Sequence, residues 1–131
     1  VKPFANVVDT IKQMHAAGLT LTIASSRGRD SLPHLVQSIG IGKYISYIVS
    51  AEDVVNAKPH PEPVLKTLEH LDAKPQETLV VGDMAFDIEM GRRANTFTCG
   101  VSYGNGSVNE LEEAGANWVI DDFAQLLNIV F

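Results

Sequence analysis

Residues 78–91 of the chain read TLVVGDMAFDIEMG, and the fold can be worked out from this stretch outward. The apolar run at residues 79–81 stops at Gly82 and Asp83, and a second acid, Asp87, follows one helical turn later. A short apolar run that ends at such a polar turn is typical of a buried strand. We therefore predict a strand over residues 78–83 and a helix from about Phe86 to Ala94.

Strand and helix signals alternate along the rest of the chain. Near the N-terminus, Val7, Ile11 and Met14 recur at helical spacing, and the apolar, β-branched residues 19–26 predict a strand. Strands that alternate with helices favour right-handed crossovers and a mostly parallel sheet. We expect an α/β fold in a single domain over residues 1–131, with further strands at residues 44–50, 96–101 and 117–121 and helices near residues 31–39, 63–71, 108–114 and 123–127.

The totals exclude several classes of protein. A net charge of -6 argues against a general nucleic-acid or anionic-membrane surface, although a local pocket can still bind a phosphorylated small molecule. Cys99 is the single cysteine, which excludes an internal disulfide framework and favours a reducing cytoplasm. No apolar run is long enough to span a bilayer. The start, VKPFANVVDT, lacks an initiator Met and the features of a signal peptide, which hints at a trimmed, cleaved or partial chain.

Polar residues that follow the predicted strands are the candidates for a site. Ligands of open α/β sheets bind beyond the carboxyl ends of the strands. Hydroxyls, an ammonium and carboxylates that meet at this edge would suit a phosphate and a hard cation, and they are supplied by Ser25, Ser26, Asp53, Lys58 and Asp83.

Asp83 and Asp87 can be weighed by the energy of placing them together. Two carboxylates about 6 Å apart repel by roughly 3 kcal/mol at an effective dielectric constant of 20. A helix N-terminus returns only about 0.3–1 kcal/mol per acid. A partly buried pair would therefore benefit from Mg²⁺, which prefers oxygen ligands. The alternative is that Asp83 caps the helix while Asp87 faces solvent.

Ordinary structural roles also remain open for the other candidates. Most lysines are solvated, so Lys58 taken alone does not indicate catalysis. Ser25 or Ser26 could simply cap the following helix.

Four stretches of the chain can be compared with a known family. They are LTIASS (residues 21–26), AKPHPEPVLKTLEHL (57–71), ETLVVGDMAFDIEMGRRA (77–94) and GVSYGNGSVNELEEAGANWVIDDFAQLL (100–127). Together they resemble a haloacid dehalogenase-like hydrolase of the phosphoglycolate-phosphatase-like group. Three motifs fall in the family's order and the tail is similar too, so the resemblance runs from Pro3 to the C-terminus. It implies a Rossmann-like, mostly parallel sheet flanked by helices.

The resemblance implies a role for each candidate. Ser25 would hydrogen-bond the transferring phosphoryl group, helped by the backbone N–H of Ser26, and Lys58 would neutralise charge there. Asp83 would bind Mg²⁺, and Asp87 would lie close to the metal or hold its waters. The family's reaction transfers a phosphoryl group through an aspartyl-phosphate. The expected activity is a Mg²⁺-dependent phosphatase acting on a small phosphorylated metabolite.

The family's nucleophile is missing from the sequence. The nucleophilic aspartate ends the family's first strand in a D-x-D motif, and neither that strand nor the α-helical cap is found here. Asp9, in NVVDTIK, lies within a predicted amphipathic helix, so we interpret it as a solvated residue. We therefore expect an N-terminally incomplete core, and a chain that is inactive alone.

By resemblance, the absent strand lies between the Ser25 strand and the Asp83 strand. Each buried backbone group left unpaired costs roughly 1–3 kcal/mol. Three outcomes follow: the chain belongs to a longer protein with the missing N-terminal segment, the flanking strands pair with each other, or a partner such as a second copy of the chain supplies a strand. Alternative functions are a phosphosugar mutase of the same superfamily, a non-catalytic phosphate- or metal-binding module, and a purely structural fragment.

Overall fold

The computed structural model describes residues 5–102 and 106–131. These residues form two compact units, and each is described by itself. Unit 1 comprises Val1–Asp53 together with Asp122–Phe131, and unit 2 comprises Val54–Asp121. None of the helices in the described part of the chain has both the length and the apolar character needed to cross a membrane.

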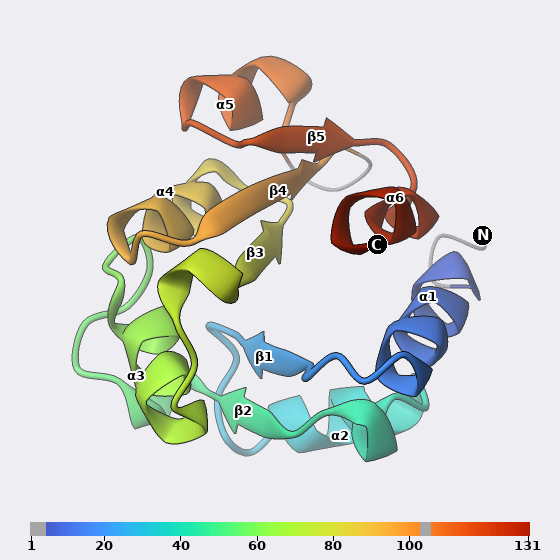
Figure 1. The fold of residues 1–131 in the computed structure, drawn as a ribbon. Helices are drawn as coiled ribbons and strands as arrows, with labels where there is room; N and C mark the ends of the chain where they lie inside the picture. Colours follow the sequence, from blue (N-terminus) through green and yellow to red (C-terminus); the bar gives the residue numbers. More distant parts are fainter. Residues whose placement is uncertain (1–4, 103–105) are drawn as a thin grey trace. The chain divides into compact units, whose positions relative to one another are not determined.

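Unit 1 contains a two-stranded parallel sheet. Thr22 lies opposite Tyr47, and Ala24 lies opposite Val49. In Figure 1 this sheet is drawn in blue and green, with α2 beside it. The elements of unit 1 are α1 (Ala5–Ala16), β1 (Thr22–Ala24), α2 (Leu32–Ser38), η1 (Gly42–Tyr44), β2 (Tyr47–Val49), η2 (Ala51–Asp53), η4 (Phe123–Leu126) and α6 (Leu127–Val130), where η marks a 3₁₀ helix.

The amphipathic pattern at the N-terminus forms the predicted helix. Ile11 and Met14 are buried on one face of α1, which packs against η4. Asp9 is exposed on the same helix, as predicted. Gly18 follows α1 with φ +94°, a left-handed conformation that glycine adopts without a steric penalty.

Unit 2 contains a three-stranded parallel sheet in the order β3-β4-β5. Val81 of β3 pairs with Cys99 of β4, and Cys99 pairs with Trp118 of β5. Figure 1 shows α4 and α5 beside these strands. The elements are α3 (Glu62–Leu71), η3 (Pro75–Glu77), β3 (Leu79–Gly82), α4 (Ala85–Arg93), β4 (Phe97–Val101), α5 (Val108–Glu113) and β5 (Trp118–Ile120).

Helix α4 connects two apolar clusters of unit 2. Ile88 of α4 is fully buried with Leu111 of α5. Met90, also of α4, packs with Val64 and Leu68 of α3. The side chains that follow the Gly82–Asp83 turn therefore sit on a helix that is fixed from two sides by burial of apolar surface.

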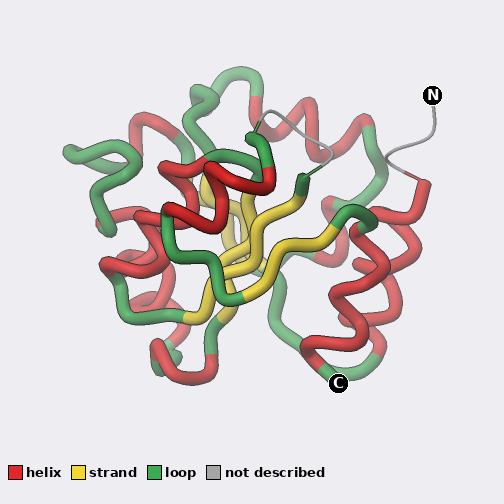
Figure 2. The backbone as a smooth tube through the Cα atoms, turned by 90° about the horizontal axis from the view of Figure 1, so that it is seen from above, coloured by secondary structure: helices red, strands yellow, loops and turns green. Residues whose placement is uncertain are grey.

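The α/β class and the parallel pairing are confirmed, whereas several boundaries differ from the prediction. The strands are shorter, since β1 covers only Thr22–Ala24 of the predicted 19–26, and Figure 2 shows how little of the chain is strand. The closing helix begins as the 3₁₀ turn η4 and continues as α6. Residues 103–105, which are part of the stretch quoted above as residues 100–127, lie outside the described part of the chain.

The two sheets bear on the expectation of an absent strand. In the described residues β1 is hydrogen-bonded to β2 in unit 1, and β3 to β4 in unit 2. The absent strand and the three outcomes for it therefore stay predictions. The single-domain boundary at residues 1–131 stays a prediction.

Candidate active site

The predicted site residues are divided between the two units. Ser25 and Ser26 follow β1 in unit 1. Lys58, Asp83 and Asp87 all belong to unit 2, where they lie in the loop before α3, directly after β3 and in the first turn of α4. The structure therefore shows the geometry within each group, and the convergence of both groups on one phosphate stays a prediction.

Lys58 and Asp87 form a buried ion pair. The ammonium of Lys58 donates to Oδ1 of Asp87 at 2.7 Å, and the two side chains are only 13% and 9% exposed. The sequence alternative in which Asp87 faces solvent is therefore wrong. The other oxygen, Oδ2, accepts the backbone N–H of Met84 at 3.3 Å, so Asp87 also satisfies a free donor at the start of α4.

Gly82 makes room for this pair. A Cβ placed on Gly82 would overlap the side chain of Asp87. The glycine at the end of β3 is thus required by a close approach, because the chain must turn directly over the carboxylate that holds Lys58.

Asp83 occupies the turn between β3 and α4. Its side chain is half-buried, and its backbone carbonyl accepts the N–H of Gly106 at 2.7 Å. The segment that leads into α5 is thereby tied to the same turn. Asp83 lies before the first turn of α4, where the helix dipole favours negative charge.

The loop that carries Lys58 is braced by residues that the sequence reasoning missed. The carboxylate of Glu62 accepts the backbone N–H groups of Val55 at 3.0 Å and Asn56 at 2.8 Å. These two hydrogen bonds lower the pKa of Glu62. His60 accepts the N–H of Glu62 at its Nδ1, at 3.0 Å, so this imidazole caps α3. An acid in the first turn of a helix was the available signal for Glu62.

Ser25 is oriented by its own loop. Its N–H donates to the carbonyl of Val49 at 2.9 Å, which continues the pairing of β1 with β2. Its Oγ accepts the N–H of Arg27 at 3.0 Å, which leaves the hydroxyl proton available to donate to an anion. Ser26 is exposed. The alternative that Ser25 or Ser26 caps the following helix is wrong, because Ser31 is the residue that precedes α2, and its side chain makes no capping hydrogen bond.

The donor set fits Mg²⁺ only when substrate and water complete it. Asp83 contributes a half-buried carboxylate at the turn after β3, and Asp87 contributes a carboxylate that also binds Lys58 and Met84. Within the described residues there is no group of three or more His, Cys, Asp or Glu side chains that could hold a metal. Mg²⁺ in phosphoryl-transfer sites commonly uses one or two carboxylates and keeps several waters. These residues therefore fit an Mg²⁺ ion whose remaining ligands are oxygens of the substrate and of water.

Cys99 plays no part in this site. It is fully buried in β4, and burial raises the pKa of its thiol to about 11. The thiol therefore stays protonated at neutral pH, and Cys99 packs as a small residue of the core.

The chain resembles known phosphatases over nearly its whole length. It is 35% identical over 130 residues to pyrophosphatase PpaX of Oceanobacillus iheyensis, covering 99% of this chain and 61% of that protein. It is 33% identical over 124 residues to phosphoglycolate phosphatase of Salmonella paratyphi A, covering 95% of this chain and 49% of that protein. The chain thus spans roughly half to three fifths of the length of these relatives.

Solved structures agree with the sequence relatives. A crystal structure titled as a predicted phosphoglycolate phosphatase from Haemophilus somnus 129PT matches with a TM-score of 0.91 and 25% identity, over 96% of this chain and 56% of that one. A hydrolase from Pseudomonas syringae matches with a TM-score of 0.85 and 30% identity, over 94% of this chain and 56% of that one. The family model for haloacid dehalogenase-like hydrolases matches residues 1–101. The chain therefore belongs to the haloacid dehalogenase-like hydrolase family.

Proposed function

We propose that the chain forms part of a Mg²⁺-dependent phosphatase that cleaves a small phosphorylated metabolite through an aspartyl-phosphate. The observation that carries this proposal is the buried Lys58–Asp87 pair beside the Gly82–Asp83 turn. Burying two charges is expensive and often adds nothing to stability. A pair kept at the carboxyl end of a parallel strand is better explained by chemistry that needs a fixed ammonium.

The residues of the chain would divide the work as follows. Ser25 would donate its hydroxyl proton to a phosphoryl oxygen, because its own oxygen already accepts from Arg27. The backbone N–H of Ser26 would donate to a second oxygen. Lys58, held by Asp87, would balance the negative charge of the phosphoryl group. In the reaction, an aspartate oxygen forms a bond to phosphorus while the substrate's oxygen leaves, and water then cleaves the aspartyl-phosphate.

Asp83 would hold the metal, and Asp87 would lie close to the metal or hold its waters. Bound Mg²⁺ would supply charge neutralisation at the phosphoryl oxygens. Asp83 is suited to this task because its carboxylate is half-buried at the turn that follows β3.

The nucleophile must come from outside these residues. Residues 5–102 and 106–131 hold no strand that ends in the family's D-x-D motif. We propose that an aspartate-bearing strand is provided by an N-terminal segment of the same protein or by a partner such as a second copy of the chain. The alternative function, a phosphosugar mutase, uses the same core, so it also requires an aspartate from another segment or chain.

Turnover of p-nitrophenyl phosphate tests the proposal. The 131-residue chain alone should give no turnover above background. Joined to or assembled with an aspartate-bearing strand, it should turn over the substrate only with Mg²⁺, and Asp83→Ala should abolish that activity. Turnover by the chain alone that disappears in Asp83→Ala would contradict the need for an added nucleophile.

A further inference from the structure

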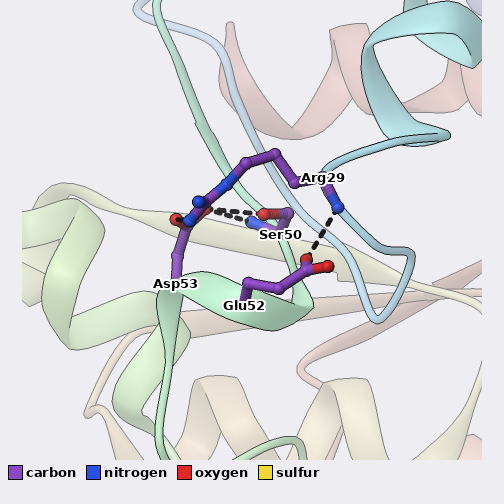
Figure 3. A network of polar contacts seen from close by, with 4 residues as sticks. All are labelled: Arg29, Ser50, Glu52 and Asp53. Atoms are coloured by element: carbon purple, nitrogen blue, oxygen red, sulfur yellow. Dashed lines mark hydrogen bonds and ion pairs between the residues drawn. The ribbon is translucent and has the colours of Figure 1, made fainter.

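The loop that carries Ser25 is tied to the segment that follows β2. The carbonyl of Arg27 accepts the N–H of Ala51 at 2.9 Å. The backbone N–H of Arg29 donates to Oε1 of Glu52 at 2.7 Å, and its guanidinium donates to Oδ1 of Asp53 at 2.6 Å. Figure 3 shows the last two contacts and their neighbours. The path of this loop, which has no regular secondary structure, is therefore set by its contacts with η2.

Asp53 lies at the centre of this network. Its Oδ2 accepts both the backbone N–H and the hydroxyl of Ser50, each at 2.8 Å, while Oδ1 binds Arg29. The hydrogen bonds from Ser50, with that from Arg29, lower the pKa of Asp53 to about 2. The carboxylate is therefore charged at neutral pH, and Ser50, which is only 4% exposed, anchors it to the end of β2.

The carboxylate of Glu52 contacts the backbone of the same loop. A Cβ on Gly28 would lie 3.2 Å from Oε2 of Glu52, so the chain passes close to this carboxylate. Two consecutive acids thus bind a single residue, Arg29. Glu52 accepts a hydrogen bond from its backbone N–H, and Asp53 accepts one from its guanidinium.

The position of the Ser25 hydroxyl depends on this path. At one end of the loop, the N–H of Ser25 is bound to Val49. Two residues later, the N–H of Arg27 binds the Ser25 hydroxyl oxygen and its carbonyl binds Ala51. The direction of the hydroxyl proton, and that of the Ser26 N–H between them, follow from where Arg27 and Arg29 are held.

We infer that Asp53, acting through Arg29 and Ser50, is a positioning residue that aims the Ser25 hydroxyl and the Ser26 N–H at a phosphoryl group. The inference rests on the proposed function, which makes Ser25 and Ser26 the phosphate-binding groups. Asp53 does not touch the phosphate itself, because both of its oxygens are engaged by protein donors.

The test uses inorganic phosphate titrated into the 131-residue chain, followed by the ¹⁵N–¹H signals of Ser25 and Ser26. Asp53→Asn should weaken phosphate binding by roughly five- to tenfold, which corresponds to about 1–1.4 kcal/mol, the net contribution of a typical hydrogen bond. Arg29→Met, which leaves Asp53 bound to Ser50, should weaken it similarly, and Arg29→Lys should restore most of the affinity. The matched control is Asp9→Asn, the same change at an exposed acid on α1 of the same unit.

The outcomes separate this inference from the function on which it rests. If the Ser25 and Ser26 signals of the wild-type chain do not shift when phosphate is added, both the phosphate site and the inference are overturned. A wild-type response that Asp53→Asn and Arg29→Met leave unchanged in affinity overturns the inference alone. Weaker binding by a variant that is still folded at the titration temperature, rescued by Arg29→Lys, supports a positioning role, because a merely structural role would shift amide signals throughout the unit and would not single out those of Ser25 and Ser26.

Discussion

The two units each contain a short ion pair beside a predicted site residue, and the pairs differ mainly in their surroundings. Lys58 and Asp87 approach to 2.7 Å with side chains 13% and 9% exposed. Arg29 and Asp53 approach to 2.6 Å with side chains 64% and 31% exposed. Water screens the second pair and hardly reaches the first. Distance alone therefore says little about the worth of an ion pair, and burial decides what happens when one partner is removed.

The largest effect is expected from breaking the buried pair. Lys58→Met leaves the carboxylate of Asp87 buried without its cation, which should lower the free energy of unfolding by about 3–5 kcal/mol. Urea denaturation measures this loss. Lys74→Met removes an exposed lysine of the same unit and should change stability by less than about 0.5 kcal/mol. Equal effects of the two variants would show that the pair is not buried in solution.

The buried pair should also be sensitive to the size of the residue at position 82, where the chain turns over Asp87. Gly82→Ala introduces a Cβ that overlaps the Asp87 side chain and should cost about 1–3 kcal/mol through the displacement that follows. Thermal or urea unfolding detects the loss. A variant as stable as the wild type would mean that Asp87 has room to move away from Lys58.

Removing the charge of Glu62, which binds the loop that carries Lys58, should have a smaller effect on stability. Glu62→Gln keeps a carbonyl acceptor but loses the charge that binds Val55 and Asn56, so we expect a loss of about 1 kcal/mol. Hydrogen exchange of these two amides should quicken together. Glu69→Gln, at an exposed position of the same helix, is the control and should leave both rates unchanged.

The exposed pair should show the smallest effect at neutral pH and a distinct dependence on acid. Because the folded pKa of Asp53 is about 2, below its ordinary value of 3.8, its contribution to stability is present above pH 4 and is lost as the pH falls toward 2. Asp53→Asn should therefore remove part of the acid sensitivity in this window, at a cost below about 1 kcal/mol at pH 7. Acid titration of both chains by circular dichroism measures the difference, and parallel curves would contradict it.

The sequence predicted the class of fold because hydrophobic periodicity is local. The apolar stripe with Ile11 and Met14, and the alternating strands, follow from spacing that a reader can count. Strand ends were less predictable. The Thr22–Ala24 strand is shorter than its apolar run because its paired register with β2 covers only three residues, beyond which a single hydrogen bond continues on either side.

The partners of the candidate residues could not be read from spacing. Asp87 was identified as one of two acids on a helix, yet its cation, Lys58, comes from a loop far away in the sequence. The same holds for Arg29 and Asp53, which the chain brings together from the ends of two paired strands. Local patterns reveal which residues follow a strand, whereas only the folded chain reveals which charge each of them faces.

The central claim is that Lys58, fixed by Asp87, serves phosphoryl transfer. Its most direct test is the turnover number for p-nitrophenyl phosphate with Mg²⁺, measured on the chain completed by an aspartate-bearing strand, for Lys58→Met against Lys74→Met. We expect Lys58→Met to lower the turnover number by about 100-fold or more, as for the loss of one preorganised donor, in a protein that is still folded at the assay temperature. A folded Lys58→Met enzyme that turns over substrate as fast as Lys74→Met would contradict the claim.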